Sequence, residues 1–463
     1  MPLILTSRNP LHAFIRARAI HPSSQDPAIV PLVLMASAAA ALSDMTKSCL
    51  SVAAIPMAAE FGWSNSVVGQ FQSALFLGFL LTQLPGGTLS KRFTGRTVLK
   101  AAVLMWSLGH ALTPLGASLG VYPLCAARLA VGLGQGLAPT ALTDVLARNV
   151  PPSFRARAAG AVFTGFNVGA VLSLVVTPIS IDKLGWQPIF YAIGGLGVFW
   201  CVAWDGLSET RREREMDAML RGREEQEGGG GMPLWDAMVG RGAGPGDAGI
   251  PWGAFFASSA VWAVIAGHFA DNWGKFALTT WMPTFFHDSL GVDTDAAALL
   301  TVLPLALGIG VACFASPQSD ALIARGWPVT QVRKLMMGLA LFGPAAFLGG
   351  ACVFGGSDPL VLVCLLTCAM GVSRFAVASL YCIHQDMNPA FAGTLLGITN
   401  TFGALAGVLS AVATGIIEDR SGSWNLSLFL PAMVVYCVGG IAWLVYADAT
   451  PKDFLGEVGE VSE

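Results

Sequence analysis

The stretch YPLCAARLAVGLGQGLAPTALTDVL, residues 122–146, decides how this chain folds. It is apolar and long enough to cross the ~30 Å hydrocarbon core of a bilayer as one helix. Its only charges are Arg128 and Asp144. An arginine at the centre of a bilayer costs about 3 kcal/mol or more, so it normally faces the inside of a protein and has a partner there. No nearby acid on the same helix neutralises Arg128, so we expect a site that receives its negative charge from outside the protein.

The composition places the whole chain in a membrane. Of its 463 residues, 54% are hydrophobic and 12% are charged, and the mean hydropathy is +0.63, whereas soluble domains are about 25% charged. The apolar runs are continuous and do not alternate, which favours helices over a membrane β-barrel. We predict an all-α membrane protein with twelve helices, near residues 29–55, 66–85, 97–118, 122–146, 157–178, 186–204, 255–283, 297–315, 334–354, 358–382, 391–417 and 425–446.

Lysine and arginine are distributed unevenly between the two ends of these predicted helices. Of the 26 cations, four lie within helices, and among the others only Lys183 and Arg420 fall on the side opposite to the N-terminus. An excess of positive charge marks the cytoplasmic side of a membrane protein. Both termini and the long central loop are therefore expected on the cytoplasmic or stromal side.

The central loop divides the chain into two halves. We predict an N-terminal segment at 1–28, a six-helix bundle at 29–204, a connector at 205–250, a second six-helix bundle at 251–447 and a tail at 448–463. The connector mixes charges of both signs and then becomes rich in glycine, which is typical of a solvated linker. The first 25 residues contain three arginines and no acid, as a transit peptide does.

Three further cations lie within predicted helices: Lys47, Lys275 and Arg374. Asp44 precedes Lys47 by three residues and Asp271 precedes Lys275 by four, so each lysine could simply be neutralised on its own helix. Arg374 has no acid within a turn. If two to four of these cations converge between the halves, the cavity would favour a small anion, and the planar guanidinium suits carboxylate or phosphate oxygens.

Polar residues also mark possible gating or coupling positions. His384 and Asp386 follow Tyr381 at the end of the tenth predicted helix, where an interfacial cap or gate is a commoner role than a proton relay. The segment 268–283, with Asp271 and Asn272, is too polar to face lipid and is expected to line the cavity. Basic turns occupy equivalent places in the two halves, a weak internal symmetry of the kind that transporters show; the inner-gate candidates there are Lys91, Arg92, Asp320 and Arg333.

Two other patterns have simpler explanations. Gly132, Gly134 and Gly136 do not follow a strand, so they indicate close helix packing and no nucleotide loop. The nine cysteines lie in or beside apolar runs without a ligand cluster, which favours small buried packing residues over disulfides or a metal site. We expect no metal, no cofactor and no catalytic residue.

Longer strings resemble a known family. The sequence is similar to the anion:cation symporter branch of the major facilitator superfamily, which contains vesicular glutamate transporters, sialin and the plant plastid phosphate transporters, and it is most like the plastid group. The strings that carry the resemblance spread over most of residues 44–447 and include RLAVGLGQGLAPTALTDVLARNVPPSFRAR from Arg128, PWGAFFASSAVWAVIAGHFADNWGKFALTTWMPTFF from Pro251 and HQDMNPAFAGTLLGITNTFGALAG from His384.

The resemblance implies a major facilitator fold, with twelve helices in two pseudo-symmetric six-helix bundles and a central site alternately open to each side. Family members hold the anion with a basic residue of the first helix and an arginine of the fourth, matched here by Lys47 and Arg128. Gln72 matches a polar position of the second helix, which is glutamine in the plastid group.

The sequence departs from the family pattern at several positions. Gln135 replaces the fourth-helix acid implicated in proton coupling. This leaves sodium, another acid such as Asp44 or Asp271, or uncoupled flux. Lys91 stands where an aspartate is usual, although Asp320 is present in the second half. The list of substrate-binding candidates is Lys47, Gln72, Arg128, Gln135, Lys275 and Arg374, the last two being uncharged in most relatives and implying a more positive cavity.

The first hypothesis is a secondary transporter of inorganic phosphate, coupled to Na⁺ or H⁺. An organic anion such as ascorbate or glutamate is the alternative substrate, and a non-transporting receptor or scaffold is the alternative class. We expect no enzyme activity and no nucleic-acid partner. The protein should act as a monomer in the bilayer, in a plastid envelope or thylakoid membrane or in another cellular membrane.

Overall fold

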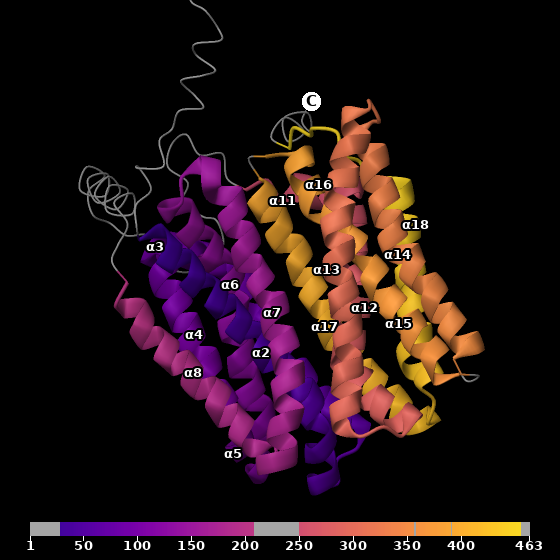
Figure 1. Ribbon diagram of the computed structural model, residues 1–463. Helices are drawn as coiled ribbons and strands as arrows, with labels where there is room; N and C mark the ends of the chain where they lie inside the picture. Colours follow the sequence, from indigo (N-terminus) through magenta and orange to yellow (C-terminus); the bar gives the residue numbers. More distant parts are fainter. Residues whose placement is uncertain (1–27, 208–249, 356–357, 390, 455–463) are drawn as a thin grey trace, which may run out of the picture.

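The computed structural model describes residues 28–207, 250–355, 358–389 and 391–454. Figure 1 shows a bundle of long helices, and the described residues contain no strand. The all-α prediction is confirmed for this part of the chain. Most of the predicted connector, most of the N-terminal segment and residues 455–463 lie outside the described residues.

The first half of the molecule is built from six membrane-crossing segments, drawn from indigo to magenta in Figure 1. Their bounds are α2 Ile29–Phe61, α3 Asn65–Phe93, α4 Gly95–Ala111 with α5 Thr113–Leu119, α6 Val121–Asn149, α7 Pro152–Leu184 and α8 Gln187–Asp205. The predicted third helix, 97–118, is not continuous: it bends by 42° between α4 and α5. Pro114 at the start of α5 lacks the backbone N–H that would continue the ladder.

The second half, drawn in orange and yellow, begins with a short helix, α11 Trp252–Ala257. Six segments follow: α12 Ser259–Leu290, α13 Thr294–Ala324, α14 Val329–Phe354, α15 Pro359–Val372 with η2 Ser373–Ala378 and α16 Leu380–Met387, α17 Ala392–Ser421, and η3 Asn425–Phe429 with α18 Leu430–Tyr446. The predicted tenth helix is interrupted by η2, a 3₁₀ stretch that contains Arg374. Such a stretch inside a longer helix often marks a functional hinge.

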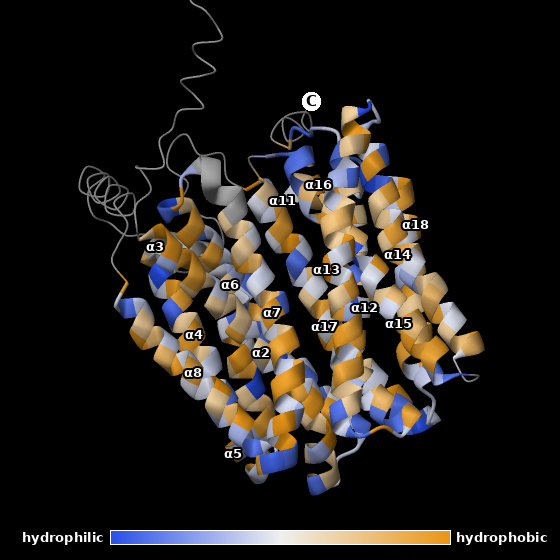
Figure 2. Cartoon of the chain, viewed as in Figure 1, coloured by the Kyte–Doolittle hydropathy of each residue, from blue (hydrophilic) through white to orange (hydrophobic). Residues whose placement is uncertain are grey.

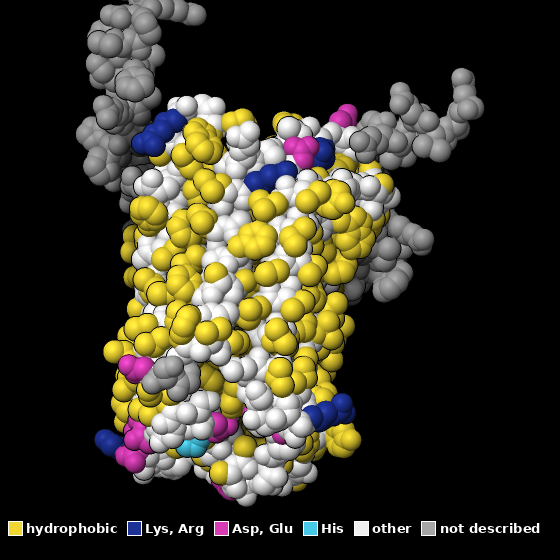
Figure 3. All heavy atoms as spheres, turned by 90° about the vertical axis from the view of Figure 1, so that its right-hand side faces the viewer, with side chains coloured by type: hydrophobic (Ala, Val, Ile, Leu, Met, Phe, Trp, Pro, Cys, Tyr) yellow, Lys and Arg dark blue, Asp and Glu magenta, His cyan; other side chains and the backbone are white. Residues whose placement is uncertain are grey.

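Among the described residues, nine helices are apolar and long enough to span a membrane, and the bent pair α4 and α5 makes a tenth. The remaining two, α3 and α12, have 29 and 32 residues and are more polar because both carry residues of the interior. In Figure 2 hydrophobic residues predominate along the middle of the helices. On the face shown in Figure 3, hydrophobic side chains cover the middle of the bundle and charged side chains lie at its two ends.

Glycines allow helices α3 and α6 to touch backbone to backbone. A Cβ atom on Gly132 would lie 1.9 Å from the carbonyl oxygen of Leu75, and one on Gly136 would lie 2.5 Å from that of Phe79. Gly134 faces α4 in the same way, with a Cβ distance of 2.6 Å to the carbonyl oxygen of Ala102. The prediction that these three glycines pack helices together is confirmed.

The two halves meet near the face opposite to the start of α2 and the end of α18. We call this the outer face and the opposite one the inner face. Asp419 of α17 accepts hydrogen bonds from the backbone N–H groups of Asn65 (2.9 Å) and Ser66 (2.7 Å) at the start of α3. A Cβ on Gly69 would lie 2.6 Å from the carbonyl oxygen of Ala411, so α3 and α17 are in close contact here. Near the same face, α7 and α13 pack together through a small apolar cluster that includes Leu174 and Ala298.

The cysteines depart in part from the expectation. All nine are free, but Cys313 and Cys364 are exposed on the surface of the bundle. A cysteine in an apolar span can face lipid or lie buried in the protein, and a sequence pattern does not distinguish these two positions.

Candidate anion site

Lys47 and Asp44 form the first element of the candidate site. The Lys47 Nζ lies 2.8 Å from Asp44 Oδ1, and each side chain is 26% exposed. The ammonium also lies 5.6 Å from the centroid of the Phe79 ring on α3, a favourable position over an aromatic face. The predicted pair on one helix therefore exists, and it stays accessible midway along α2.

Lys275 of α12 provides a cation from the other half. Its Nζ lies 5.5 Å from the ring centroid of Phe276, and that ring lies 4.6 Å from the ring of Phe76 on α3. Aromatic rings from α3 and α12 thus touch across the two halves. Gly407 of α17 makes room for them, since a Cβ there would lie within 2.9 Å of both Phe76 and Phe276.

The charges of the two halves converge at this place. Lys275 interacts electrostatically with Arg374, Asp271, Asp44 and Lys47. Arg374 packs its side chain over Gly308 of α13, where a Cβ would lie 3.1 Å from Arg374 Cγ. We call Asp44, Lys47, Asp271, Lys275 and Arg374 the charge cluster. The structure brings together three of the four intramembrane cations that the sequence singles out.

Asp271 and Lys275, one turn apart on α12, interact electrostatically, as the spacing predicts, but Arg374 and Asp44 also act on Lys275. Asp271 is buried, with 7% of its surface exposed, and within the described residues it forms no ion pair of 4.0 Å or less. Tyr381 of α16 is 40% exposed, yet it interacts with Asp271 and Arg374 and its ring lies 6.0 Å from the fully buried His268. Tyr381 therefore lies beside Asp271 and Arg374 of the charge cluster.

Arg128 contacts α4 and the backbone of α2, and it is not among the charges that act on Lys275. Its guanidinium is buried, with 1% of the residue exposed. The Nη1 lies 3.4 Å from Nδ1 of His110 on α4, and the Nη2 donates to the carbonyl oxygen of Thr46 at 3.4 Å. The Nε has no hydrogen-bond partner, and no described carboxylate pairs with this arginine within 4.0 Å.

Gln135 reaches the same segment of α2 from two turns further along α6. Its Nε2 donates to the Ser43 carbonyl oxygen at 2.8 Å and to Thr46 Oγ1 at 2.5 Å, while its Oε1 lacks a partner. Arg128 and Gln135, seven residues apart on α6, thus share one face of this helix, and both contact Thr46. The face of α6 that carries these two residues is turned toward α2 and α4. Neither residue contacts the charge cluster directly.

Gln72 lies at the level of Arg128. Leu75 of α3 opposes Gly132 of α6, and one turn back along the two helices come Gln72 and Arg128. The amide is buried, with 6% exposed, and its Nε2 has no hydrogen-bond partner. A buried amide donor and a buried guanidinium Nε are thus both unsatisfied at one level of the first half, which is costly unless a ligand or water satisfies them.

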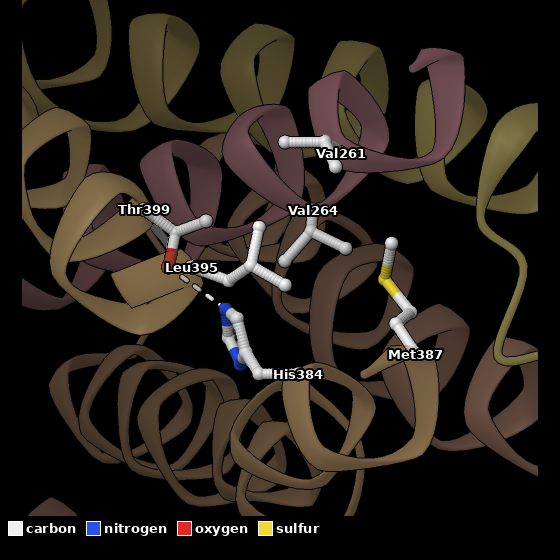
Figure 4. Close-up of a pocket in the computed structure, with 6 residues that line it drawn as sticks. All are labelled: Val261, Val264, His384, Met387, Leu395 and Thr399. Atoms are coloured by element: carbon white, nitrogen blue, oxygen red, sulfur yellow. Dashed lines mark hydrogen bonds between the residues drawn. The ribbon is translucent and has the colours of Figure 1, made fainter. Parts of the chain in front are cut away.

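His384 does not face the charge cluster. Its Nε2 lies 2.9 Å from Thr399 Oγ1, and it borders a narrow apolar cavity with Val261, Val264, Met387, Leu395 and Thr399 (Figure 4).

Asn272 packs against α17, where a Cβ on Gly403 would lie 2.2 Å from its Nδ2. His268 was not among the predicted site residues, although it begins the polar segment 268–283. It is fully buried, and both of its ring nitrogens lack a hydrogen-bond partner.

At the inner face, Arg333 of α14 and Asp386 of α16 form an ion pair. Arg333 Nε lies 2.7 Å from Asp386 Oδ2, and Nη1 donates to Ser319 Oγ at 3.0 Å and to the Ala378 carbonyl oxygen at 2.7 Å. Asp320 is exposed. The side chains of Lys91 and Arg92 lie outside the described residues.

The first half has an equivalent contact that was not predicted from the sequence. Asp144 of α6 accepts from the backbone N–H of Gly95 and from Arg148 Nε, both at 2.7 Å. The four-residue spacing of Asp144 and Arg148 on one helix was the available signal. In both halves an acid near the inner end of a helix thus contacts the start of a neighbouring one.

The fold and the charged interior are those of a membrane transporter. A profile of the Major Facilitator Superfamily matches residues 36–411, and the chain belongs to this family. Among solved structures, the D-xylose-proton symporter superposes with a TM-score of 0.66 at 18% identity, covering 92% of this chain and 99% of that one. The predicted family and the predicted major facilitator fold are confirmed, and the chain is a secondary transporter and not an enzyme.

Relatives are anion transporters of plants. The chain is 39% identical over 430 residues to "Probable anion transporter 6, chloroplastic" of Arabidopsis thaliana, covering 92% of this chain and 80% of the relative. It is 35% identical to "Sodium-dependent phosphate transport protein 1, chloroplastic" and 35% identical to "Ascorbate transporter, chloroplastic", both of Arabidopsis thaliana. The matches cover 90% of this chain in each case and 78% and 74% of the two relatives.

Proposed function

We propose that this protein moves inorganic phosphate across a plastid membrane by alternating access, as a monomer and coupled to Na⁺ or H⁺. The observation that carries the proposal is the convergence of Lys47 of the first half with Lys275 and Arg374 of the second half. An anion bound between cations of two halves draws them together, so its binding is linked to their relative position. Guanidinium and ammonium groups also match phosphate oxygens chemically.

Arg128 supports the site from behind. It holds the Thr46 carbonyl oxygen, one residue before Lys47, and so fixes the segment of α2 that presents the lysine. Its unpartnered Nε and the Gln72 Nε2 are donors that an anion can reach if α2 shifts during the transport cycle. Gln135 carries no titratable group, which favours Na⁺, or a proton on Asp44 or Asp271, as the coupling ion.

The second candidate substrate is an organic anion such as ascorbate, favoured by the relative of that name. A carboxylate or enolate would use the same cations. A receptor or scaffold that binds an anion without flux is the alternative class, and the inner-face ion pairs that suit a moving gate favour transport over it.

Uptake of radiolabelled phosphate into proteoliposomes tests the proposal. Uptake should be accelerated by a sodium or a pH gradient and should fall strongly in Lys47→Gln. Lys183→Gln is the matched control, because Lys183 is exposed at the outer end of α7. Competition by ascorbate and glutamate ranks the substrates. No phosphate uptake under any gradient would reject the proposed substrate, and binding without flux would favour a receptor.

A further inference from the structure

Helices α3 and α17 form a seam between the two halves that begins at the outer face. A Cβ on Gly415 of α17 would lie 2.3 Å from the carbonyl oxygen of Asn65. One turn of α17 further in, the carbonyl oxygen of Ala411 would lie 2.6 Å from a Cβ on Gly69 of α3. Backbone thus meets backbone at these two steps of the seam, which leaves no room for an anion to pass.

The next step of the seam is made by two aromatic side chains. Gly407 lies one turn from Ala411 toward the inner face, and a Cβ there would lie 2.8 Å from the Phe76 ring and 2.9 Å from the Phe276 ring. The centroids of these rings, from α3 and α12, are 4.6 Å apart, as in a stabilising aromatic pair. Phe76 is buried, with 7% of its surface exposed. This contact is made by side chains, which can turn aside by changing rotamer, whereas the backbone contacts further out cannot.

The two rings lie beside the lysines that are proposed to bind the anion. Lys275 directly precedes Phe276, and its Nζ lies 5.5 Å from the centroid of that ring. Phe79, one turn from Phe76 on α3, has its ring centroid 5.6 Å from Lys47 Nζ. Because α3 begins at the outer face and α12 ends there, Phe76 lies on the outer side of Phe79, and Phe276 on the outer side of Lys275. The aromatic pair therefore separates the two lysines from the outer face.

We propose that Phe76 and Phe276 form the outer gate of the central site, which opens to the outer face when the two rings part. The inference rests on the proposed function, in which an anion binds between Lys47 and Lys275. The rings do not hold the anion. They set the balance between a state that is closed to the outer face and a state that is open to it, and the structure has the rings in contact, in the closed arrangement.

The first test compares Phe276→Ala with Phe163→Ala. Phe163 is an exposed residue of α7 that pairs with Phe166 at 6.0 Å, so its removal deletes an aromatic pair outside the seam. In the purified Phe276→Ala protein, hydrogen exchange of amides 65–71, on the outer side of the gate, should be about fivefold faster or more. Amides 259–266, at the inner end of α12, should exchange as in the wild type, and Phe163→Ala should change neither rate.

Transport and binding should respond differently to Phe276→Ala. Phosphate turnover in proteoliposomes should fall about fivefold or more, because the outer side has to close in every cycle of alternating access. The dissociation constant of phosphate should change less than about threefold, because a shift between two states that bind the anion equally well leaves its affinity unchanged. A residue that lines the anion site would instead lose affinity and turnover together.

Gly407→Ala tests the gate by the opposite steric change. It keeps both rings but places a methyl group within 2.9 Å of each, so the rings must shift. We expect the same faster exchange of amides 65–71 and the same loss of turnover as in Phe276→Ala. Gly393→Ala on the same helix, where a Cβ meets nothing within 4 Å, is the control and should behave as the wild type. Gly407→Ala provides the readout if Phe276→Ala does not fold.

Wild-type exchange and turnover in both Phe276→Ala and Gly407→Ala would overturn the inference. A rise in the dissociation constant as large as the fall in turnover would overturn it as well, because it would place the rings in the anion site. Equally accelerated exchange of amides 65–71 and 259–266 would show a general loss of packing and no gate. If the wild type carries ascorbate and no phosphate, the proposed substrate fails, while the exchange rates and the turnover of ascorbate still decide the role of the rings.

Discussion

The guanidinium of Arg128 lies 3.4 Å from the carbonyl oxygen of Thr46, the residue that precedes Lys47. Arg128 of the fourth membrane segment thus hydrogen-bonds to the backbone of the first segment. The bonded residue, Thr46, precedes Lys47, which faces the second half. The relationship gives the two residues different tasks: Lys47 presents its charge to the anion, and Arg128 fixes the backbone that carries Lys47.

Arg128→Ala is therefore expected to damage both stability and transport. It leaves the buried His110 Nδ1 without its partner, removes the hydrogen bond to the Thr46 carbonyl oxygen and opens a void, a combination that costs about 3 kcal/mol or more. Uptake should fall at least tenfold and the thermal unfolding temperature should drop. Lys47→Gln should raise KM with little change in that temperature. An Arg128→Ala protein with unchanged unfolding temperature and a raised KM would show instead that the guanidinium acts mainly on the anion.

Asp419→Ala should loosen the closure of the outer face. The Asp419 carboxylate accepts the first backbone N–H groups of α3 from across the two halves, and negative charge at a helix N-terminus is stabilising. Its removal should speed hydrogen exchange of the Asn65 and Ser66 amides by about tenfold. Asp182→Ala, at an exposed outer position of α7, is the control. Exchange that is equally slow in both variants would mean that the contact does not hold the halves together.

The Arg333–Asp386 pair should show strong coupling in a double-mutant cycle. The Arg333 side chain is 8% exposed and that of Asp386 24%, and removing one partner of a buried pair is more damaging than removing both. We expect Arg333→Gln and Asp386→Asn each to lower the unfolding temperature, and the double variant to lower it by less than the sum, with a coupling of about 1–3 kcal/mol. Additive effects would indicate two independent contacts.

Gly132→Ala should disrupt the first half. The added Cβ would lie 1.9 Å from the Leu75 carbonyl oxygen, and a backbone atom cannot move aside without displacing α3. We expect poor expression of a folded protein and loss of uptake. Gly160→Ala on α7, where a Cβ meets nothing within 4 Å, should be neutral or slightly stabilising, by up to about 1 kcal/mol. Equal expression and activity of the two variants would refute the close packing of α3 and α6.

The sequence predicts features that depend on one helix at a time. The shared face of Arg128 and Gln135 follows from their spacing, and the packing role of Gly132 follows from the spacing of its neighbours. Features that depend on how helices pack against each other do not follow from the sequence of any one helix. The Arg333–Asp386 bond joins residues 53 positions apart, and the position of Arg128 behind α2 depends on how α4 and α6 pack.

Lys275 illustrates the same limit. Four-residue spacing from Asp271 favours a pair on one helix, but Arg374 and Lys47 arrive from other elements and draw both charges into a shared cluster. The break of the tenth segment at η2, which contains Arg374, was not predicted either, because no proline or glycine lies within that stretch.

Phosphate affinity of Lys275→Gln, Arg374→Gln and the double variant tests the central claim most directly, namely that an anion binds between cations of the two halves. Each single change should raise the dissociation constant about tenfold or more, and the double variant should not bind phosphate measurably. Its unfolding temperature should fall, because the buried Asp271 then lacks both cations that offset its charge, so binding is compared at a temperature at which the variant is folded. Wild-type affinity for phosphate in the folded double variant would contradict the account.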